Sequence, residues 1–413
     1  MAYQGNPQYI DLVTSILKEN YLPAWDNLIG IEPSPFLEKI KKVPLTNRTI
    51  SAAAPWGLNG GVGYGDDGTT TPASGPQKFS KFTVDAKALY CNLEISDMVV
   101  KLASSNKSAM IDVLDTEVKS GFASTKWNMG RSLFMDGKGI LAHIGASASS
   151  ATEITVDDVR FFREGMLVDC YGYASAAATD GTIISGGPFR ILNVDRSTKK
   201  IKISGNGITA STALTGTTDY GFITLQNSYK KEFTGLGAIF DSNATGIYGN
   251  NYSDYPWLKP ITVDANHAIS DIVITNGMRD SKQFHNGNID MLLFGDDAFT
   301  EYQTYMKEDN ASFVTSVNNL NFKGGHTGFE VLFGNQRAVC VNESFVPKGE
   351  IWGVNTKDWE FHHTTFDFVA YNSSIFTLVP NHNYYRALLA TYGNLICKNP
   401  GGCVRFTNCD AAS

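Results

Sequence analysis

One short stretch of this 413-residue chain has the spacing of a nucleotide-binding loop. Gly63-Tyr64-Gly65-Asp66-Asp67-Gly68 reads G-x-G-x-x-G, a pattern that binds the phosphates of a dinucleotide. Such a loop must follow a strand and open a helix whose N-terminal N–H groups face the pyrophosphate. The residues that follow, TTTPASGP, contain two prolines and a run of threonines, and the two aspartates would repel phosphate. We therefore predict no nucleotide site.

Two carboxylates at Asp296-Asp297 could act as an acid/base pair or as metal ligands. They also stand between the apolar run Asp290–Phe294 and a pattern typical of a helix. Asp is favoured at the N-cap and in the first helical turn, where the helix dipole stabilises negative charge. We favour this second interpretation, with Asp296 as the N-cap and Asp297 in the first turn.

His362-His363, with Asp358 and Glu360 nearby, could supply metal ligands. Adjacent residues of a strand face opposite sides of the sheet, so these two histidines cannot bind one ion without a bulge. The other five histidines show no ligand spacing. We predict that the chain binds no metal ion through its histidines.

The six cysteines form no C-x-x-C pair, which favours unpaired thiols over a disulfide framework in a chain of this length. They are Cys91, Cys170, Cys340, Cys397, Cys403 and Cys409. The last three lie six residues apart, so a metal or disulfide role is the alternative. The sequence also has no G-x-S-x-G, Walker or H-E-x-x-H pattern. We expect no catalytic site and no cofactor.

Composition indicates a globular protein, with 42% hydrophobic and 18% charged residues. The net charge of −7 argues against binding nucleic acid through the chain's own charge, which needs clustered Lys and Arg. Residues 271–309 hold eight acidic and three basic residues, which predicts a negative surface there. Lys200 and Lys202 are predicted to form one face of a hairpin, either simply solvated or in contact with nucleic acid. The N-terminal segment has no signal-peptide pattern, and no apolar run is long enough to span a bilayer.

The chain divides by pattern into six segments. Residues 44–93 read as two extended stretches joined by the Gly-rich segment 57–76, and residues 106–134 carry an apolar stripe at helical spacing. Short strands at regular spacing from residue 153 to 232 predict a small β-barrel. The predicted segments are an arm (1–43), an extended hairpin loop (44–93), a helical domain (94–152), the barrel (153–232), a crossing segment (233–264), and a mixed α/β domain with returning strands (265–413).

The Gly-rich tip of the predicted hairpin offers few apolar groups for its length. Ordering a backbone costs entropy at every residue, and burial of so few side chains does not offset that cost. We therefore expect the tip to be ordered by contact with another copy of the chain. The candidate contact residues are Trp56, Leu58, Val62, Tyr64, Asp66 and Asp67.

This order of segments resembles that of the major capsid proteins of tailed bacteriophages, whose shell fold is shared with encapsulins and the herpesvirus capsid floor. Two stretches carry the likeness locally: KEFTGLGAIFDSNATGIYGNNYSDYPWLKP, similar to a GL-A-I … Y-G-G … W crossing, and NIDMLLFGDDAFTEYQTYM, similar to the strand–turn–helix of the axial domain. The resemblance implies an α+β fold. Its parts would be an N-terminal arm, an extended β-hairpin loop, a long spine helix in a peripheral domain, a mixed α/β axial domain and a small inserted β-barrel.

The same resemblance implies a structural subunit of the virion. It would assemble in the host cytoplasm as hexamers and pentamers into an icosahedral head around double-stranded DNA, without sequence-specific binding. A scaffolding protein, a portal and a decoration protein are the implied partners. Some family members form Lys–Asn cross-links; Lys78 and Lys81 lie on the hairpin, but no matching Asn and Glu are recognised. The alternatives are a phage tail, baseplate or decoration protein, and a β-rich hydrolase.

Overall fold

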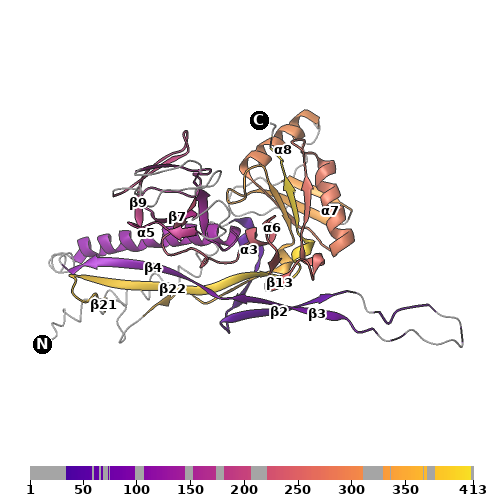
Figure 1. The fold of residues 1–413 in the computed structure, drawn as a ribbon, viewed down its shortest axis with the longest axis horizontal. Coiled ribbons are helices and arrows are strands. Elements are labelled where there is room, and N and C mark those ends of the chain that lie inside the picture. The colour runs from indigo at the N-terminus through magenta and orange to yellow at the C-terminus, as the bar shows by residue number, and fades with distance from the viewer. Residues whose placement is uncertain are drawn as a thin grey trace. The chain divides into compact units, whose positions relative to one another are not determined.

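The chain folds into two compact units. The computed structural model describes residues 34–57, 60–64, 67, 73, 75–97, 107–144, 152–173, 181–205, 221–309, 329–334, 336–365, 367–369 and 377–410. Unit 1 combines residues 1–134 with residues 234–413, and unit 2 comprises residues 135–233 (Figure 1). Helices and strands are mixed in unit 1, so the α+β prediction is confirmed.

A two-stranded hairpin leaves the start of the described chain. The short helix α3 (Pro35–Lys39) and strand β1 (Lys41–Pro44) precede it. Strands β2 (Thr49–Trp56) and β3 (Lys78–Asp85) then pair antiparallel over eight residues each. The hairpin is therefore shorter than the predicted extended stretches, because the chain after Asp85 turns into a different sheet. The part of the arm that precedes residue 34 lies outside the described residues.

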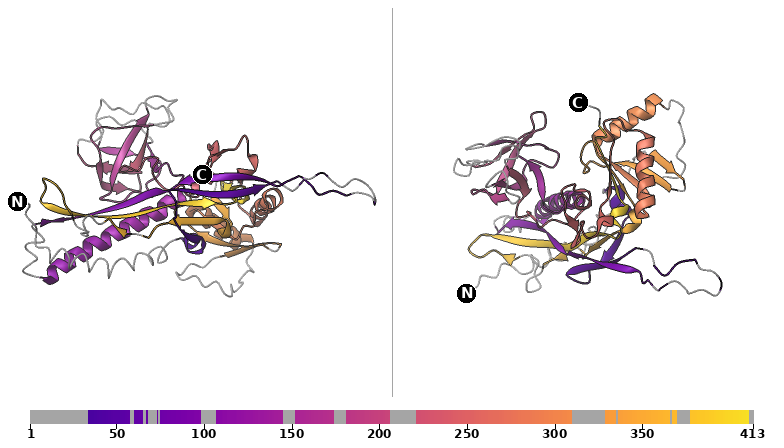
Figure 2. Two further views of the ribbon diagram at one scale, coloured as in Figure 1. Left: turned by 90° about the horizontal axis from the view of Figure 1, so that it is seen from below. Right: turned by 45° about the vertical axis from the view of Figure 1, so that its right-hand side comes forward.

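The long helix is confirmed as α5 (Lys107–Phe134), and it packs along a six-stranded sheet (Figure 2, left). The sheet is built on β22 (Tyr384–Cys397), which pairs with β4 (Lys87–Ser96) along one side. Strands β19 (Trp359–His363), β20 (Asp367–Phe368) and β21 (Thr377–Leu378) pair with the other side of β22, and β1 adds to β19 in parallel. Gly121 lies where β4 packs on α5: an added Cβ would sit 2.8 Å from Leu93 Cδ2.

A second six-stranded sheet forms the α/β part of unit 1, in the order β14-β23-β18-β15-β17-β16. Its strands are β14 (Ile261–Asp264), β15 (Met291–Phe294), β16 (Phe329–Phe333), β17 (Gln336–Asn342), β18 (Ile351–Val354) and β23 (Val404–Thr407). Helices α7 (Asp271–His285) and α8 (Asp296–Asp309) cover one face. Side chains such as Ile274, Tyr302 and Phe294 are fully buried between these layers, which explains the almost wholly apolar sequence of β15.

The crossing segment joins the two sheets of unit 1 by short elements. These are α6 (Gly237–Phe240), β12 (Gly246–Ile247), β13 (Asn250–Asn251) and the 3-10 turn η3 (Pro256–Leu258). Two further 3-10 turns are η4 (Thr356–Asp358) and η5 (Pro400–Gly402). Leu236 N–H donates to the carbonyl of Leu133 at 2.9 Å, so the two chain segments of unit 1 meet at the C-terminal end of α5.

Unit 2 is a small barrel of seven strands, in the order β5-β11-β7-β9-β10-β6 with β8 on β7. The strands are β5 (Ile140–His143), β6 (Glu153–Thr155), β7 (Leu167–Tyr173), β8 (Gly181–Ile183), β9 (Phe189–Asp195), β10 (Lys200–Ile203) and β11 (Gly221–Leu225). A bridge between Ile144 and Val156 links the strands at the two ends of this order and closes the barrel. The unit begins before residue 153, because β5 pairs with β11 and is part of the barrel rather than of the helical segment.

Candidate functional site

The β2–β3 hairpin is anchored at its base through one of its two edges. Ala86 N–H donates to the carbonyl of Arg48 at 2.8 Å, which makes this pair hydrogen-bonded. Pairs alternate along an antiparallel ladder, so the odd-numbered residues of both strands point their backbone polar groups away from the partner strand. On β3 these outward groups belong to Phe79, Lys81, Thr83 and Asp85.

Three of these four outward residues have partners in other segments of unit 1. Thr83 N–H donates to the carbonyl of Tyr248 at 3.1 Å. Asn250 Nδ2 donates to the carbonyl of Lys81 at 3.1 Å, and Asn394 Nδ2 donates to the carbonyl of Asp85 at 2.8 Å. We call Tyr248, Asn250 and Asn394 the hairpin clamp. Each such hydrogen bond contributes about 0.5–1.5 kcal/mol, so together they fix the base of the hairpin.

The clamp depends on an unusual turn. Tyr248 and Gly249 join β12 to β13 with φ angles of 51° and 82°, the pattern of a type I′ turn. A positive φ is rare for an aromatic residue. Tyr248 is held there because its side chain is buried, its ring centroid lies 5.6 Å from that of Phe82, and its hydroxyl accepts from Cys397 N–H at 3.1 Å. Burial, reinforced by the neighbouring Cys397 thiol, raises the pKa of Tyr248 well above its usual value.

Asn394 uses its whole amide at the junction of three segments. It is fully buried, accepts from Thr234 N–H at 2.8 Å, and donates to the carbonyl of Asp85. Apolar packing supports the same region: the Phe82 ring is buried and stacks at 6.5 Å on Trp257. The crossing segment therefore holds β3 by hydrogen bonds and by aromatic contacts.

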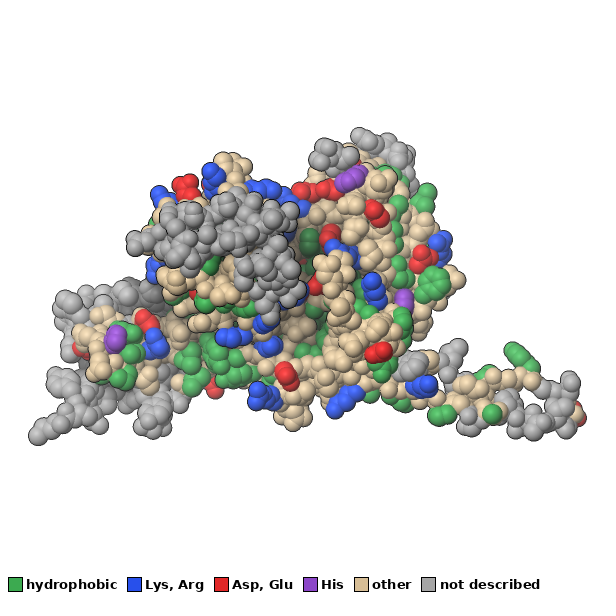
Figure 3. All heavy atoms as spheres, viewed as in Figure 1, with side chains coloured by type: hydrophobic (Ala, Val, Ile, Leu, Met, Phe, Trp, Pro, Cys, Tyr) green, Lys and Arg blue, Asp and Glu red, His purple; other side chains and the backbone are tan. Residues whose placement is uncertain are grey.

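The other end of the hairpin is exposed. Val62 is 84% exposed and Tyr64 is as exposed as an isolated residue, at 107%. On β3, Phe79 is 65% exposed, and Gly60 N–H donates to the carbonyl of Gly75 at 3.0 Å across the hairpin. Figure 3 shows apolar side chains on the surface of this hairpin. Apolar groups presented in this way are typical of a surface that another chain covers.

Three of the six predicted contact residues have described side chains. Val62, Tyr64 and Asp67 are exposed, as a contact surface between copies requires before assembly. Leu58 and Asp66 lie outside the described residues, and for Trp56 only the backbone pairing with Lys78 is described. Their role in a contact stays a prediction.

The outer edge of β2 differs from that of β3. Thr49, Ser51 and Ala53 are its exposed outward residues, and Pro55 follows them at the next outward position. Proline has no N–H and is tolerated at an edge, where it blocks the pairing of a further strand. The hairpin thus has one edge held by the clamp and one edge limited by a proline.

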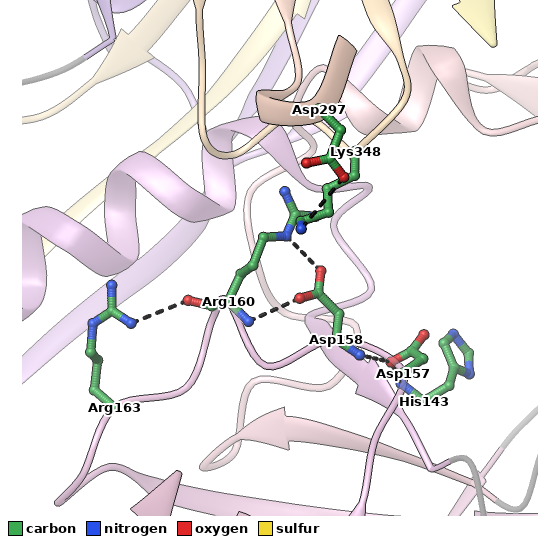
Figure 4. A network of polar contacts seen from close by, with 7 residues as sticks. All are labelled: His143, Asp157, Asp158, Arg160, Arg163, Asp297 and Lys348. Carbon is green, nitrogen blue, oxygen red and sulfur yellow. Dashed lines mark hydrogen bonds and ion pairs between the residues drawn. The ribbon is translucent and has the colours of Figure 1, made fainter. Parts of the chain in front are cut away.

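The paired aspartates belong to a helix terminus. Helix α8 begins at Asp296, and Phe299 N–H donates to the carbonyl of Gly295. The prediction that Asp296 is the N-cap was therefore wrong by one residue: both carboxylates lie in the first turn, where the helix dipole stabilises them. Asp297 also forms an ion pair of 3.5 Å with Lys348, drawn in Figure 4.

A second pair of acidic residues, Asp157-Asp158 in unit 2, also stabilises backbone (Figure 4). Asp157 Oδ1 accepts from His143 N–H at 2.8 Å and from Asp158 N–H at 2.7 Å. Asp158 accepts from the backbone N–H and from Nε of Arg160, at 2.9 and 2.7 Å. These carboxylates stabilise a turn between β6 and β7. Their hydrogen bonds to the backbone account for two adjacent aspartates without a catalytic or metal-binding role.

The two adjacent histidines face different environments, as the alternation of a strand predicts. His362 lies 3.5 Å from Glu360, whereas the ring of His363 stacks on Phe361 with centroids 5.0 Å apart. Burial alone would raise the pKa of Glu360, but hydrogen bonds from Lys398 and Lys41 outweigh it and lower the pKa to about 2. Glu360 on β19 therefore links two other segments through charge-assisted hydrogen bonds: one from Lys41 on β1, and one from Lys398, the residue after β22.

All six cysteines are free thiols, and Cys397, Cys403 and Cys409 are buried. Burial raises the pKa of Cys409 to about 12, so this thiol stays protonated at neutral pH. In the described ranges, no group of three His, Cys, Asp or Glu side chains is placed to hold a metal ion. No helix of that same part of the chain is both long and apolar enough to cross a membrane.

Sequence reasoning missed the hairpin clamp. The Tyr248-Gly249-Asn250 stretch does carry a turn signal, since Gly followed by Asn favours positive φ. Nothing in the sequence indicates that this turn holds a strand 165 residues earlier in the chain, or that Asn394 joins it. The clamp exists only because three distant segments meet.

Comparison with known proteins gives likeness in solved structures only. No family model matches the chain, and no curated protein does. The cyanophage A-1(L) capsid asymmetric unit is similar over 92% of this chain and 93% of its own, with 11% identity and a TM-score of 0.49. The satellite phage P4 procapsid including its size determination protein is similar over 98% of both chains, at 10% identity and a TM-score of 0.43. The capsid of the native GTA particle covers 93% and 92%, at 8% identity and 0.46.

These likenesses extend over nearly the whole chain and concern capsid particles in each case. Identities of about a tenth and TM-scores below 0.5 assign no function by themselves.

Proposed function

We propose that the chain is a structural shell subunit, the major capsid protein of a phage head, and that it is not an enzyme. The observation that carries this proposal is the hairpin: a base fixed by the clamp and a far end whose apolar side chains are exposed. Anchoring a hairpin so firmly and leaving Val62 and Tyr64 in water is costly unless another copy covers them.

On this proposal, the copies assemble as hexamers and pentamers into an icosahedral shell around double-stranded DNA. The net charge of −7 suits such a lining, since a surface that gripped DNA would hinder its packing. A scaffolding protein and a portal act during assembly in the host cytoplasm, and a decoration protein is a further candidate partner.

The test is to express the full chain and to examine it by negative-stain microscopy and light scattering. Closed shells, or separate hexamers and pentamers, are the expected products. A monomer with hydrolytic turnover, or tubes and spikes in place of shells, would contradict the proposal and favour the hydrolase or the tail and baseplate alternatives.

The hairpin tip is tested by Val62→Ser combined with Tyr64→Ala. Both side chains are exposed in the single chain, so the subunit should fold with an unchanged melting temperature and fail to form stable shells. Ile183→Ser, which removes another exposed apolar side chain (54%) from unit 2, is the control and should assemble as the wild type does. Normal shells from the Val62/Tyr64 variant would contradict the proposal that these hairpin side chains contact another copy during assembly.

A further inference from the structure

Hairpin β9–β10 of unit 2 concentrates positive charge. Five cationic side chains are exposed on it: Arg190, Arg196, Lys199, Lys200 and Lys202. Among the described residues, none of these five forms an ion pair or a side-chain hydrogen bond with a carboxylate. Cations gathered in this way, without internal partners, are available to an outside anion.

The acidic residues near this cationic hairpin do not neutralise it. Asp195 lies in the turn, and its carboxylate accepts four hydrogen bonds from Ser197 and Thr198, at 2.6–3.2 Å. Glu153 on β6 stands opposite Lys202 in the register, on the same face. Five cations against these two carboxylates leave an excess of three positive charges.

The charge of the chain is divided between its units. Unit 2 holds ten basic and ten acidic residues, which leaves 24 basic and 31 acidic residues, and therefore the whole net charge of −7, in unit 1. Among the described elements of unit 1, α8 holds the most acidic residues, with five acidic residues and one basic residue in fourteen. Many copies of an acidic subunit repel one another unless a basic surface of one meets an acidic surface of the next.

The spacing of charges on the two elements also agrees. Lys200 and Lys202 lie on one face of a strand, so their Cα atoms are about 6.8 Å apart. Asp297 and Glu301 lie one turn apart on α8, at about 6 Å along one side of the helix. Asp297 is exposed and Glu301 is half-buried, and the ion pair of Asp297 with Lys348 is long at 3.5 Å.

We infer that the cationic hairpin β9–β10 is a contact surface for helix α8 of a second copy of the chain. The inference deepens the proposed function and rests on it for the identity of the partner. Contacts of this kind act mainly on the rate and the register of association. Salt at about 0.5 M, where the Debye length is about 4–5 Å, weakens them strongly.

The experiment uses the full chain and follows its association by light scattering and sedimentation, in about 50 mM and about 500 mM NaCl. Reversal of charge by Lys200→Glu with Lys202→Glu should slow association at low salt at least about tenfold. The reversed side chains would face Asp195 and Glu153 across the strands, so the rates are compared at a temperature at which the variant is fully folded, as its melting curve shows. Lys259→Glu with Lys357→Glu makes the same change of charge at exposed lysines of unit 1 and should have little effect. Addition of Asp297→Lys and Glu301→Lys to the reversed hairpin should restore the rate to within about threefold of the wild type.

Three outcomes would overturn the inference: association that does not respond to salt, an equal loss in the control variant, or no recovery in the doubly reversed chain. Binding of a double-stranded DNA oligonucleotide that depends on Lys200 and Lys202, without any effect on association, would also overturn it in favour of a nucleic-acid surface. Copies that associate through the charges but form no shells would contradict the proposed function and leave this contact standing. Shells that form independently of salt and of these charges would support the proposed function and contradict this contact.

Discussion

Glu343 is a buried carboxylate. It follows β17, is only 6% exposed, and accepts weakly from Phe345 N–H at 3.5 Å. Burial raises the pKa of Glu343 to about 7, against a smaller opposing effect of the Ser34 hydroxyl. Because Ser34 is the N-cap of α3, this carboxylate lies where the described chain begins.

Glu343 predicts a pH dependence of stability. Its pKa is higher in the folded than in the unfolded chain, so its contribution is fully present below pH 4.5 and is lost as the pH rises through about 7. Removing the charge by Glu343→Gln should therefore raise the free energy of unfolding at pH 8 by up to about 3 kcal/mol and flatten its decline between pH 5 and 8. Denaturant unfolding at several pH values measures this. Glu330→Gln, on the exposed face of β16, is the control, and a parallel change in both variants would disprove the assignment.

At the scale of elements, the hairpin clamp links a tight turn to a strand that reaches outward. Gly249 has φ +82°, and an added Cβ would lie 3.1 Å from Thr83 Oγ1. An alanine there meets both backbone strain and the side chain of β3, whereas Gly205 has φ +79° with open space around it. Alanine at either position has the same backbone strain, but only alanine at Gly249 would contact the hairpin. Comparing the two variants therefore distinguishes the effect of strain from the effect on the hairpin.

Gly249→Ala should loosen the base of the hairpin. We expect a loss of about 1–2 kcal/mol in stability, from the left-handed backbone alone, and faster amide exchange at Thr83, whose N–H donates to the neighbouring Tyr248 carbonyl. Gly205→Ala should cost a similar amount of stability and leave exchange on β3 unchanged. Hydrogen exchange with mass spectrometry on both variants is the measurement. Equal exchange on β3 in the two variants would mean that the turn does not hold the hairpin.

At the scale of the whole molecule, unit 2 is inserted at a point where unit 1 is already closed. Leu236 N–H donates to the carbonyl of Leu133, and within unit 2 Lys230 N–H donates to the carbonyl of Lys138 at 2.8 Å. Each unit therefore has its own chain ends side by side. Insertions of this kind are tolerated because neither fold depends on the connection.

Replacement of residues 135–233 by a short Gly-Ser linker should leave a folded unit 1. We expect cooperative unfolding, helical circular dichroism from α5, α7 and α8, and protection of β22 from exchange, because both six-stranded sheets of unit 1 are complete without the insert. The full-length chain is the reference. A molten product without cooperative unfolding would show that unit 1 requires the insert.

The sequence by itself determined the elements whose signals are local. The long helix α5 carries apolar residues at intervals of three and four, and the buried strand β15 is a continuous apolar run, so both were predicted nearly to the residue. The prediction that residues 63–68 form no dinucleotide loop likewise rests on local chemistry, since prolines and paired aspartates are incompatible with a phosphate-binding helix, and it stays a prediction. The α+β class was implied by the resemblance in the order of the segments.

Only the tertiary structure decided how the hairpin is held and where its sheet ends. The alternation of residues 78–93 is continuous, yet it serves two sheets: β3 pairs with β2, and β4 pairs with β22 some 300 residues away. The pairing of Asn394 with Asp85, and of Asn250 with Lys81, likewise has no local signature. A hydrogen bond between distant segments depends on how the whole chain folds to bring their backbones together. Short-range sequence patterns do not predict that proximity.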